Sequence, residues 1–212
     1  MAKLKNGIFG PVSGKLGSVV GGNWKGIPYL RSAPKKKKKP AARSAAQMAN
    51  EQKMKFTNKL LVPFQPYINI GFQHLAIEKT ALSAAYSVNF HQAVTGVYPN
   101  LAVDYPNLMI SSGNLPGLIN PVAGLHGDTI ELIWEKGGSS KTSFDDQLML
   151  VLYAPDLDLA DGFIGLALRR DLHSRFKFNP RMQGQEILVY VAMTSMDRKR
   201  ISDSVYLGRM IP

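Results

Sequence analysis

The stretches QLMLVLY at Gln147–Tyr153 and EILVYVAMT at Glu186–Thr194 decide the fold. Both are short, rich in Leu, Val and Ile, and bounded by Asp, Pro, Gln or Ser, which is typical of β-strands. Thr129–Trp134 (TIELIW) adds an alternation of apolar and polar residues, the pattern of a strand with one buried face. The sequence therefore predicts a β domain in the C-terminal half.

Further strand-like segments lie on either side of these stretches. With them, six or seven short strands follow one another at roughly 10–20-residue spacing, separated by clusters of Gly, Pro, Asp and Ser. This spacing predicts an antiparallel sandwich that begins near Gly113–Gly127 and fills residues 113–212. The additional segments are Leu108–Ile110, Phe163–Arg169, Arg175–Phe178 and Ser204–Ile211.

The C-terminal hundred residues resemble a fibronectin type III or immunoglobulin-like sandwich. In that resemblance Trp134 ends an early strand, and Ile187–Val191 is the penultimate strand. A turn at Asp197–Lys199 then leads into a last strand at Ser204–Leu207. The chain has no cysteine, so an intersheet disulfide is excluded and the fibronectin-like version fits better.

Residues 41–112 change in composition and predict a helical or mixed segment. Ala, Gln, Met, Lys and Glu dominate Ala41–Leu61, which favours a helix, and Ser44 is suited to its N-cap. Pro63 and Pro66 end this helix, and a second helix is expected within Tyr67–Ala93. The expected core positions of this region are Ile68, Phe72, Leu75, Leu82 and Tyr86.

Residues 1–33 form a glycine-rich β arm, and residues 34–40 a lysine-rich linker. The short β-type pieces Leu16–Val20 and Ile27–Arg31 lie between glycines, and Gly21–Asn23 (GGN) is a turn signal between them. The arm has too few large apolar residues to be a domain by itself. We expect one or two small hairpins, or a segment that becomes strand only against a partner. The linker is expected to be stiff and extended.

The positive charge is concentrated at the N-terminal end. Residues 1–59 contain 14 Lys or Arg against one acid, a net charge of +13, whereas residues 60–212 carry −2. Such asymmetry typically marks an arm that meets a polyanion or an acidic partner surface. The alternative is a solvated tail whose charge only aids solubility.

The composition excludes several classes of protein. Without cysteine there are no disulfides, zinc–thiolate sites or thiol catalysis. No apolar run approaches the ~20 residues of a membrane-spanning helix, so no membrane span is expected. No apolar signal-peptide core follows Met1–Gly7, so we expect a chain that is cytoplasmic at synthesis. Incorporation into a particle or filament stays open.

Short motifs along nearly the whole chain carry a second resemblance. They are Asn6–Gly10, Ser13–Gly17, Val19–Gly21, Trp24–Gly26, Arg31-Ser32, Lys55-Phe56, Ile70–Phe72, Asp145–Gln147 and Ser202–Gly208. In these the chain is similar to an uncharacterised bacterial family of unknown function. It departs from that pattern in the unbroken run Lys35–Lys39. The resemblance implies an organisation but no activity.

Two features suggest a phosphate site or a metal site, but neither has the residues and spacing that such a site requires. Gly10–Lys15 (GPVSGK) looks like a phosphate-binding loop, but it is one residue short and Leu16 replaces the Ser or Thr that holds Mg²⁺. These glycines are expected to permit tight turns instead. The histidines lack metal-ligand spacing and are expected to be structural or surface residues; they are His74, His91, His126 and His173.

The acidic motifs are expected to be structural. Asp156, Asp158 and Asp161 resemble a fragment of a calcium loop, but no glutamate closes it, so a solvated loop between strands is expected. Asp145-Asp146 is expected to cap a turn before the strand at Gln147. We therefore expect no catalytic, cofactor or metal site, and no enzyme.

The basic segment is the strongest functional feature. Its cations can neutralise several phosphates at once, with an affinity that falls as salt rises, or meet an acidic protein. The expected contact residues are Lys25, Arg31, Lys35, Lys36, Lys37, Lys38, Lys39, Arg43, Lys53, Lys55 and Lys59. Phe9, Trp24 and Tyr29 are the expected assembly anchors, because large aromatic side chains dominate interface energies.

Two hypotheses of function follow. The first is a non-enzymatic assembly protein, a homo-oligomeric subunit of a filament, shell or phage-like particle, whose arm adds strands to its neighbour while the basic segment contacts a polyanion. The second is a nucleic-acid-binding accessory protein, in which the arm and the Ala41–Leu61 helix bind phosphates and the sandwich binds protein. We expect the first, with no small-molecule substrate.

Overall fold

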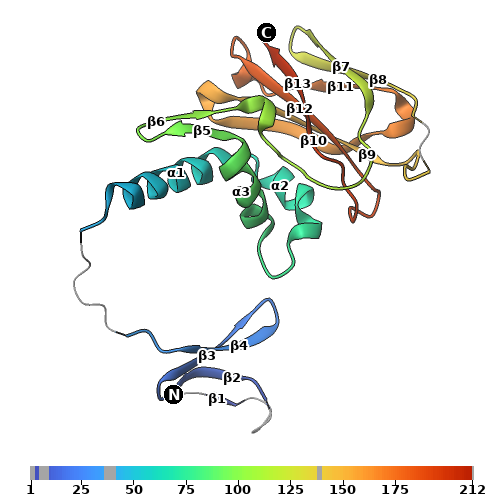
Figure 1. The fold of residues 1–212 in the computed structure, drawn as a ribbon. Helices are drawn as coiled ribbons and strands as arrows, with labels where there is room; N and C mark the ends of the chain where they lie inside the picture. Colours follow the sequence, from blue (N-terminus) through green and yellow to red (C-terminus); the bar gives the residue numbers. More distant parts are fainter. Residues whose placement is uncertain (1–2, 5–9, 36–41, 138–139, 212) are drawn as a thin grey trace. The chain divides into compact units, whose positions relative to one another are not determined.

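The structure is a computed structural model that describes residues 3–4, 10–35, 42–137 and 140–211 (Figure 1). The chain divides into two compact units, Met1–Ser44 and Ala45–Pro212. The predicted fold class is confirmed, since the protein is mainly β, with antiparallel sheets and a smaller helical part.

The first unit is a meander of antiparallel strands, called here the arm sheet, with the order β1-β2-β3-β4. Its strands are β1 (Lys3–Leu4), β2 (Val12–Leu16), β3 (Val19–Trp24) and β4 (Ile27–Ser32). The predicted turn at Gly21–Asn23 is wrong, because these residues lie inside β3. The chain turns instead at Gly17-Ser18 and Lys25-Gly26, so the expected strand piece Leu16–Val20 spans a turn.

Two glycines in β3 are required by packing rather than by turning. A side chain on Gly21 would collide with the backbone carbonyl of Val12. One on Gly22 would lie 2.7 Å from the ring of Tyr29 across the ladder. A Gly-Gly pair therefore marks close approach of backbone and ring here, which local sequence does not distinguish from a turn.

The second unit begins with helices. They are α1 (Ala45–Leu61), α2 (Gln65–Gly71) and α3 (Ala81–Gln92), with the short helical turn η1 (Gln73–Leu75) between the last two. The helix expected at Ala41–Leu61 starts directly after Ser44 and ends before Pro63, as the capping and proline signals predict. The single helix expected within Tyr67–Ala93 is in fact two. The helix α2 ends at Gly71, and α3 begins after its N-cap Thr80, whose hydroxyl accepts a hydrogen bond from Ser83 N.

A hairpin and the sandwich complete the second unit. The hairpin is β5 (Val94–Val97) and β6 (Asn100–Val103), and a short turn, η2 (Tyr105–Asn107), follows it. The sandwich strands are β7 (Ile119–His126), β8 (Thr129–Glu135), β9 (Gln147–Ala154), β10 (Leu159–Leu168), β11 (His173–Lys177), β12 (Ile187–Thr194) and β13 (Val205–Met210). Short helical turns η3 (Pro155–Leu157), η4 (Arg169–Asp171) and η5 (Pro180–Met182) link some of them.

The sandwich consists of a central sheet, of order β10-β9-β12-β13, and an outer sheet, of order β11-β8-β7. All of their pairings are antiparallel. The first, second and fifth strands thus form one sheet, and the third, fourth, sixth and seventh form the other. This arrangement is an antiparallel β-sandwich, in agreement with the immunoglobulin-like resemblance.

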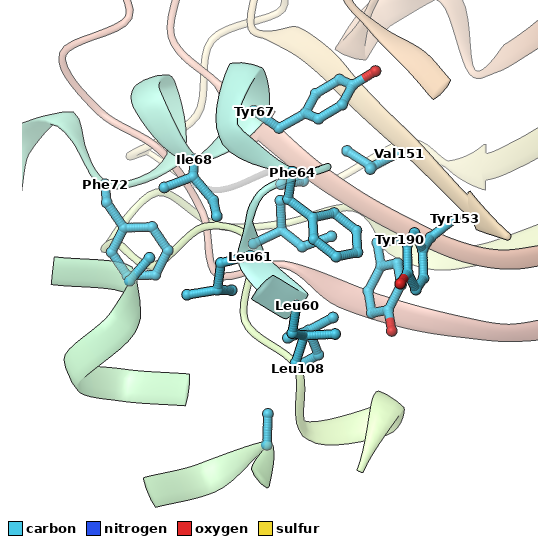
Figure 2. Close-up of a cluster of buried hydrophobic side chains, with 14 of the residues drawn as sticks. Leu60, Leu61, Phe64, Tyr67, Ile68, Phe72, Leu108, Val151, Tyr153 and Tyr190 are labelled. Carbon is cyan, nitrogen blue, oxygen red and sulfur yellow. The ribbon is translucent and has the colours of Figure 1, made fainter. Parts of the chain in front are cut away.

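The central sheet is buried on both faces. One face of β9 and β12, including Leu150 and Val189, packs against Leu132 and Trp134 of the outer sheet. The opposite face packs against the helices (Figures 1 and 2). Figure 2 shows Phe64 lying beside Tyr153 and Tyr190, with ring centroids 4.6 and 6.4 Å away. A strand buried on both faces must be apolar throughout, which explains the stretches at residues 147–153 and 186–194.

The helical region and the sandwich share one core, which differs from the expected start of a separate domain at residue 113. Ile68 and Phe72 are fully buried, as expected, whereas Leu75 is exposed. Leu108–Ile110 is not a strand. Leu108 and Ile110 are buried, and Ile110 N donates to the hydroxyl of Ser204 rather than to a ladder.

Candidate functional site

The arm sheet has almost no core of its own. Gly21 is the one buried residue among those that the structure describes in Met1–Ser44. All six residues of β4 are exposed. Large apolar side chains of the sheet are 43–63% exposed, and they are Leu16, Trp24, Ile27, Tyr29 and Leu30. Sheets gain most of their stability by burying one face, so this sheet presents unburied apolar surface.

Register places the expected anchors Trp24 and Tyr29 on one face. Trp24 pairs with Ile27, and Gly22 pairs with Tyr29. Cross-strand partners, and every second residue along a strand, point to the same side of a sheet. Trp24, Ile27 and Tyr29 therefore form a continuous aromatic and aliphatic strip, called here the arm face. Phe9, the third expected anchor, lies outside the described residues.

Basic residues flank this strip. Arg31 pairs with Val20, and Val20 with Lys15, so both cations share the arm face. Lys25 sits in the two-residue turn beside Trp24, at a positive φ of 49°, followed by Gly26 at 86°. Positive φ at both turn residues fits the right-handed twist of a two-residue hairpin. An exposed strip of rings edged with cations results.

The remaining basic residues that were expected to bind a polyanion belong to both units. Lys35 and Arg43 are exposed in the first unit, and Lys36–Lys39 lie outside the described residues. Lys53, Lys55 and Lys59 belong to the second unit, on α1. The expected contact residues that the structure describes are thus divided between the two units.

The three lysines of α1 do not all project from one face of the helix. The Lys53 ammonium lies 4.6 Å from the centroid of the Phe90 ring on α3, a cation–π contact within the unit. Lys55 and Lys59 lie four residues apart on the helix, so they project on one side together. Lys59, however, lines a groove that also contains carboxylates.

This groove, called here the acidic groove, lies between the C-terminal half of α1 and the edge of the sandwich. Its volume is about 280 Å³, and it is lined by Phe56, Lys59, Leu60, Val103, Tyr105, Tyr153, Pro155, Asp156 and Asp158. The Tyr153 hydroxyl donates to Asp158 Oδ1 at 3.0 Å. Burial raises the pKa of Tyr105, and the negative charges of Glu186, Asp156 and Asp158 raise it further, against the opposing effect of Arg209. The groove is thus aromatic inside and acidic at its rim.

A second polar centre lies buried inside the sandwich. Arg169 Nε donates to Asp146 Oδ2 at 3.0 Å, and its two terminal nitrogens donate to the carbonyls of Pro116 and Gly117, each at 2.7 Å. The Arg169 carbonyl in turn accepts from the Trp134 indole at 2.9 Å. Three donors of this guanidinium are directed to protein acceptors, so the centre ties separate segments of the sandwich together.

Arg169 also forms one wall of a cavity of about 540 Å³ at this end of the sandwich. Its other lining residues include Lys136, Phe144, Arg170 and Leu172. The Arg170 guanidinium lies 5.8 Å from the centroid of the exposed Phe144 ring. The cavity thus pairs apolar walls with cations, but its most deeply buried cation is already satisfied by Asp146.

The structure bears on each weak chemical motif. Gly10–Lys15 runs into strand β2, which continues to another strand rather than to the helix that a phosphate-binding loop needs. Asp161 lies inside strand β10, where its carboxylate accepts from the backbone N–H groups of Gly162 and Asn179. The four histidines are exposed. Among the described residues, no group of three or more His, Asp or Glu could hold a metal ion.

Asp146 of the pair Asp145-Asp146 has the structural role that was predicted and a second one that was not. Asp146 accepts from Ser143 N at 3.0 Å, which closes the turn before β9 as predicted. Its pairing with Arg169 was not predicted, because 23 residues separate them. The acidic groove was missed as well, since it joins residues from 56 to 158 that carry no common local pattern.

Fold and surface together define a class of protein: an antiparallel β-sandwich backed by helices and preceded by a basic β arm. The chain belongs to the family of unknown function DUF6266, which matches residues 11–208. This confirms the full-length resemblance to an uncharacterised family. No curated protein matches the chain. In the part of the chain that the structure describes, no helix is long and apolar enough to cross a membrane.

Proposed function

We propose that this protein is a non-enzymatic assembly protein, a subunit of a filament, shell or phage-like particle. Its N-terminal arm docks on a neighbouring subunit through Trp24, Ile27 and Tyr29. The observation that carries the proposal is the exposed apolar arm face on a sheet with almost no core. A patch of this kind marks an interaction surface.

Docking through the face is better supported than docking through the edge alone. β4 is the outer strand of the arm sheet, and Ala33 N donates to Ser18 O across the β3–β4 ladder at 2.7 Å. Inward and outward backbone groups alternate, so the N–H groups of Leu30 and Ser32 point away from β3. Pro28 occupies the other outward position and has no N–H. An added strand can therefore pair along only part of β4.

Charge distribution favours a subunit-to-sandwich arrangement. Residues 1–44 contain 11 of the 26 Lys and Arg and none of the 15 Asp and Glu, so the second unit has no net charge. Two arms that meet would bring two strongly positive units together, which is unfavourable. An arm that meets the second unit of a neighbour avoids that repulsion. The excess charge is then available to a polyanion, such as a nucleic acid inside a particle.

The alternative is a nucleic-acid-binding accessory protein, with the sandwich as a protein-interaction module. The observation that favours it is the position of Lys15 and Arg31 beside Trp24 and Tyr29 on the arm face. Cations next to exposed rings suit single-stranded nucleic acid, because the rings stack on bases while the cations neutralise phosphates. This binding would weaken steeply with salt, whereas apolar docking would not.

The test is the self-association constant of the full-length protein and of its Trp24→Ala variant, measured by sedimentation. We expect the variant to associate on the order of 30-fold more weakly, since a central aromatic anchor contributes about 2 kcal/mol. Lys25→Ala, which removes the neighbouring cation, is expected to change the constant by less than about threefold.

Phe144→Ala is the matched control, because Phe144 is an aromatic of the second unit that is also well exposed. It should leave self-association unchanged. Equal losses in the Trp24, Lys25 and Phe144 variants would contradict docking through the arm face. Unchanged association together with lost, salt-sensitive oligonucleotide binding would favour the alternative function.

A further inference from the structure

We infer that the acidic groove is the acceptor for the lysine run Lys35–Lys39 of a second copy of this chain. The inference rests on the proposed assembly function and names the surface on the neighbouring subunit that receives the basic segment. It assigns the run Lys35–Lys39 to a protein partner and leaves the other cations of the first unit to a polyanion.

The shape and chemistry of the groove suit a lysine side chain. Phe56, Tyr105 and Tyr153 provide an aromatic floor for the four methylenes of a lysine. Asp156 and Asp158 are exposed at the rim, where an ammonium would end. Ring faces also attract the cation itself.

The Asp158 carboxylate is held in position. Tyr153, which is 3% exposed, donates its hydroxyl to Asp158 Oδ1. Asp158 adopts a left-handed conformation, with φ at 50°, at the end of the short turn η3. The side chain is thus tied to the central sheet rather than free in solvent, so less entropy is lost when a lysine pairs with it.

Charge selects the occupant. Asp156 and Asp158 outweigh Lys59 within the groove. A phosphate would be repelled by this rim, and an apolar segment would leave the carboxylates unpaired. The chain itself carries five consecutive lysines between two prolines, at residues 34–40. Single exposed ion pairs contribute little, but several neighbouring lysines compete for the same rim and add to its occupancy.

A second copy is the occupant that the proposed assembly function supplies. The lysine run follows the anchors Trp24 and Tyr29 within a few residues of sequence. A subunit that docks its arm on a neighbour therefore also brings its lysine run to that neighbour.

The test is carbodiimide crosslinking of full-length protein mixed from ¹⁴N- and ¹⁵N-labelled batches, followed by mass spectrometry. Carbodiimide joins a carboxylate directly to an amine with which it is already paired. We expect crosslinks between Lys35–Lys39 and Asp156 or Asp158 that combine the two isotopes. Crosslinks within one isotope only, or spread equally over other exposed acids, would overturn the inference.

A second measurement is the binding of a fluorescent peptide of residues 33–42 to full-length protein. Asp156→Asn with Asp158→Asn should weaken binding at least tenfold. The double variant should still fold, because asparagine accepts the Tyr153 hydrogen bond and tolerates the left-handed conformation. Glu78→Gln with Glu135→Gln removes the same charge from exposed positions elsewhere and should leave binding unchanged.

The two proposals fail separately. If the wild type binds no peptide and forms no crosslinks at the groove, but Trp24→Ala still lowers self-association, the groove assignment is wrong and the arm-docking function stands. If peptide binding is specific to the groove but Trp24→Ala leaves self-association unchanged, the proposed arm docking is wrong. Equal peptide binding by both charge variants would overturn the groove as the acceptor.

Discussion

Arg169 shows how a single polar residue can organise the sandwich. Its side chain is 9% exposed and its partner Asp146 is 1% exposed, so both charges lie inside the fold. Through Pro116 and Gly117 it ties the segment before β7 to the start of β9, and through its carbonyl it holds the Trp134 indole. A buried charge that keeps its partners is tolerated, whereas one that loses its partner is strongly destabilising.

Asp146→Ala should therefore lower the free energy of unfolding by about 3–5 kcal/mol. The loss arises because the guanidinium of Arg169 stays buried without its carboxylate. Urea unfolding monitored by Trp134 fluorescence measures it. Arg170→Ala is the matched control, since Arg170 is 57% exposed and lies 3.9 Å from Asp171. That control should change stability by less than about 0.5 kcal/mol, and similar losses in both variants would contradict the buried role.

Alanine substitutions at the two glycines of β3 are expected to have different effects on amide exchange in the arm sheet. Gly21→Ala places a methyl group against the Val12 backbone carbonyl, which cannot move without separating β2 from β3. Gly22→Ala instead meets the far end of the Tyr29 side chain at 2.7 Å, and that ring can swing away. Amide exchange should thus accelerate in β2 and β3 for the first variant only. Equal exchange in both would contradict the register.

Moving Tyr29 has a functional consequence. If Tyr29 is an anchor, Gly22→Ala should weaken self-association while the arm sheet keeps its protection from exchange. Gly17→Ala, which meets no atom within 4 Å but has φ at +59°, serves as a control for strain in the arm alone.

At the scale of elements, the core between the helices and the central sheet is expected to lose stability at high pH. Burial, with a smaller contribution from Asp161, raises the pKa of Tyr67 to about 12. Burial is also the main cause of the raised pKa of Tyr153 and Tyr190, and neighbouring negative charges raise both further. The folded state therefore favours the neutral phenol. This contribution to stability is fully present below pH ~10, the ordinary tyrosine pKa, and is lost as the pH rises through about 12.

The measurement is the free energy of unfolding at pH 9 and pH 11.5. Wild type should lose stability between the two, and Tyr67→Phe should lose less, because one of the titrating groups is gone. Tyr98→Phe, at an exposed position, is the control and should behave as wild type does. An equal drop in all three proteins would contradict the role given to Tyr67.

Sequence predicted the elements that carry strong local signals. β9 and β12 are apolar along their whole length because both faces are buried, and α1 has an alanine-rich composition that ends before a proline. β7 was missed, since Ile119–His126 contains Pro121 and Gly124 and does not alternate. β5 and β6 were missed because each is four residues long. Leu108–Ile110 was predicted as a strand because burial in a loop and burial in a strand select the same side chains.

Some residues of the candidate site could likewise be identified from the sequence, and others only from the structure. Trp24 and Tyr29 were identified from composition, and the register then placed both on the arm face with Ile27. The ammonium of Lys53, one of the expected polyanion contacts, lies over the Phe90 ring, which no sequence spacing indicates. The acidic groove depends on α1, η2 and η3 meeting in three dimensions, so it became visible only in the fold.

At the scale of the whole molecule, charge and apolar surface are separated. The first unit holds all of the net charge of +11, and the second unit is neutral with two apolar cores. The arm sheet has almost no core, so a partner that covers its apolar face would stabilise it. This asymmetry is the physical basis of the proposed assembly function.

The most direct test is the light-scattering mass of the full-length protein at low and high salt, with the 260/280 absorbance ratio of the same peak. Docking of the arm face on neighbouring subunits predicts a mass several times 23.3 kDa that survives high salt, with a protein-like ratio. A nucleic-acid-rich peak that collapses to 23.3 kDa at high salt would favour the accessory-protein alternative. A monomer of 23.3 kDa at both salt concentrations would contradict the assembly function.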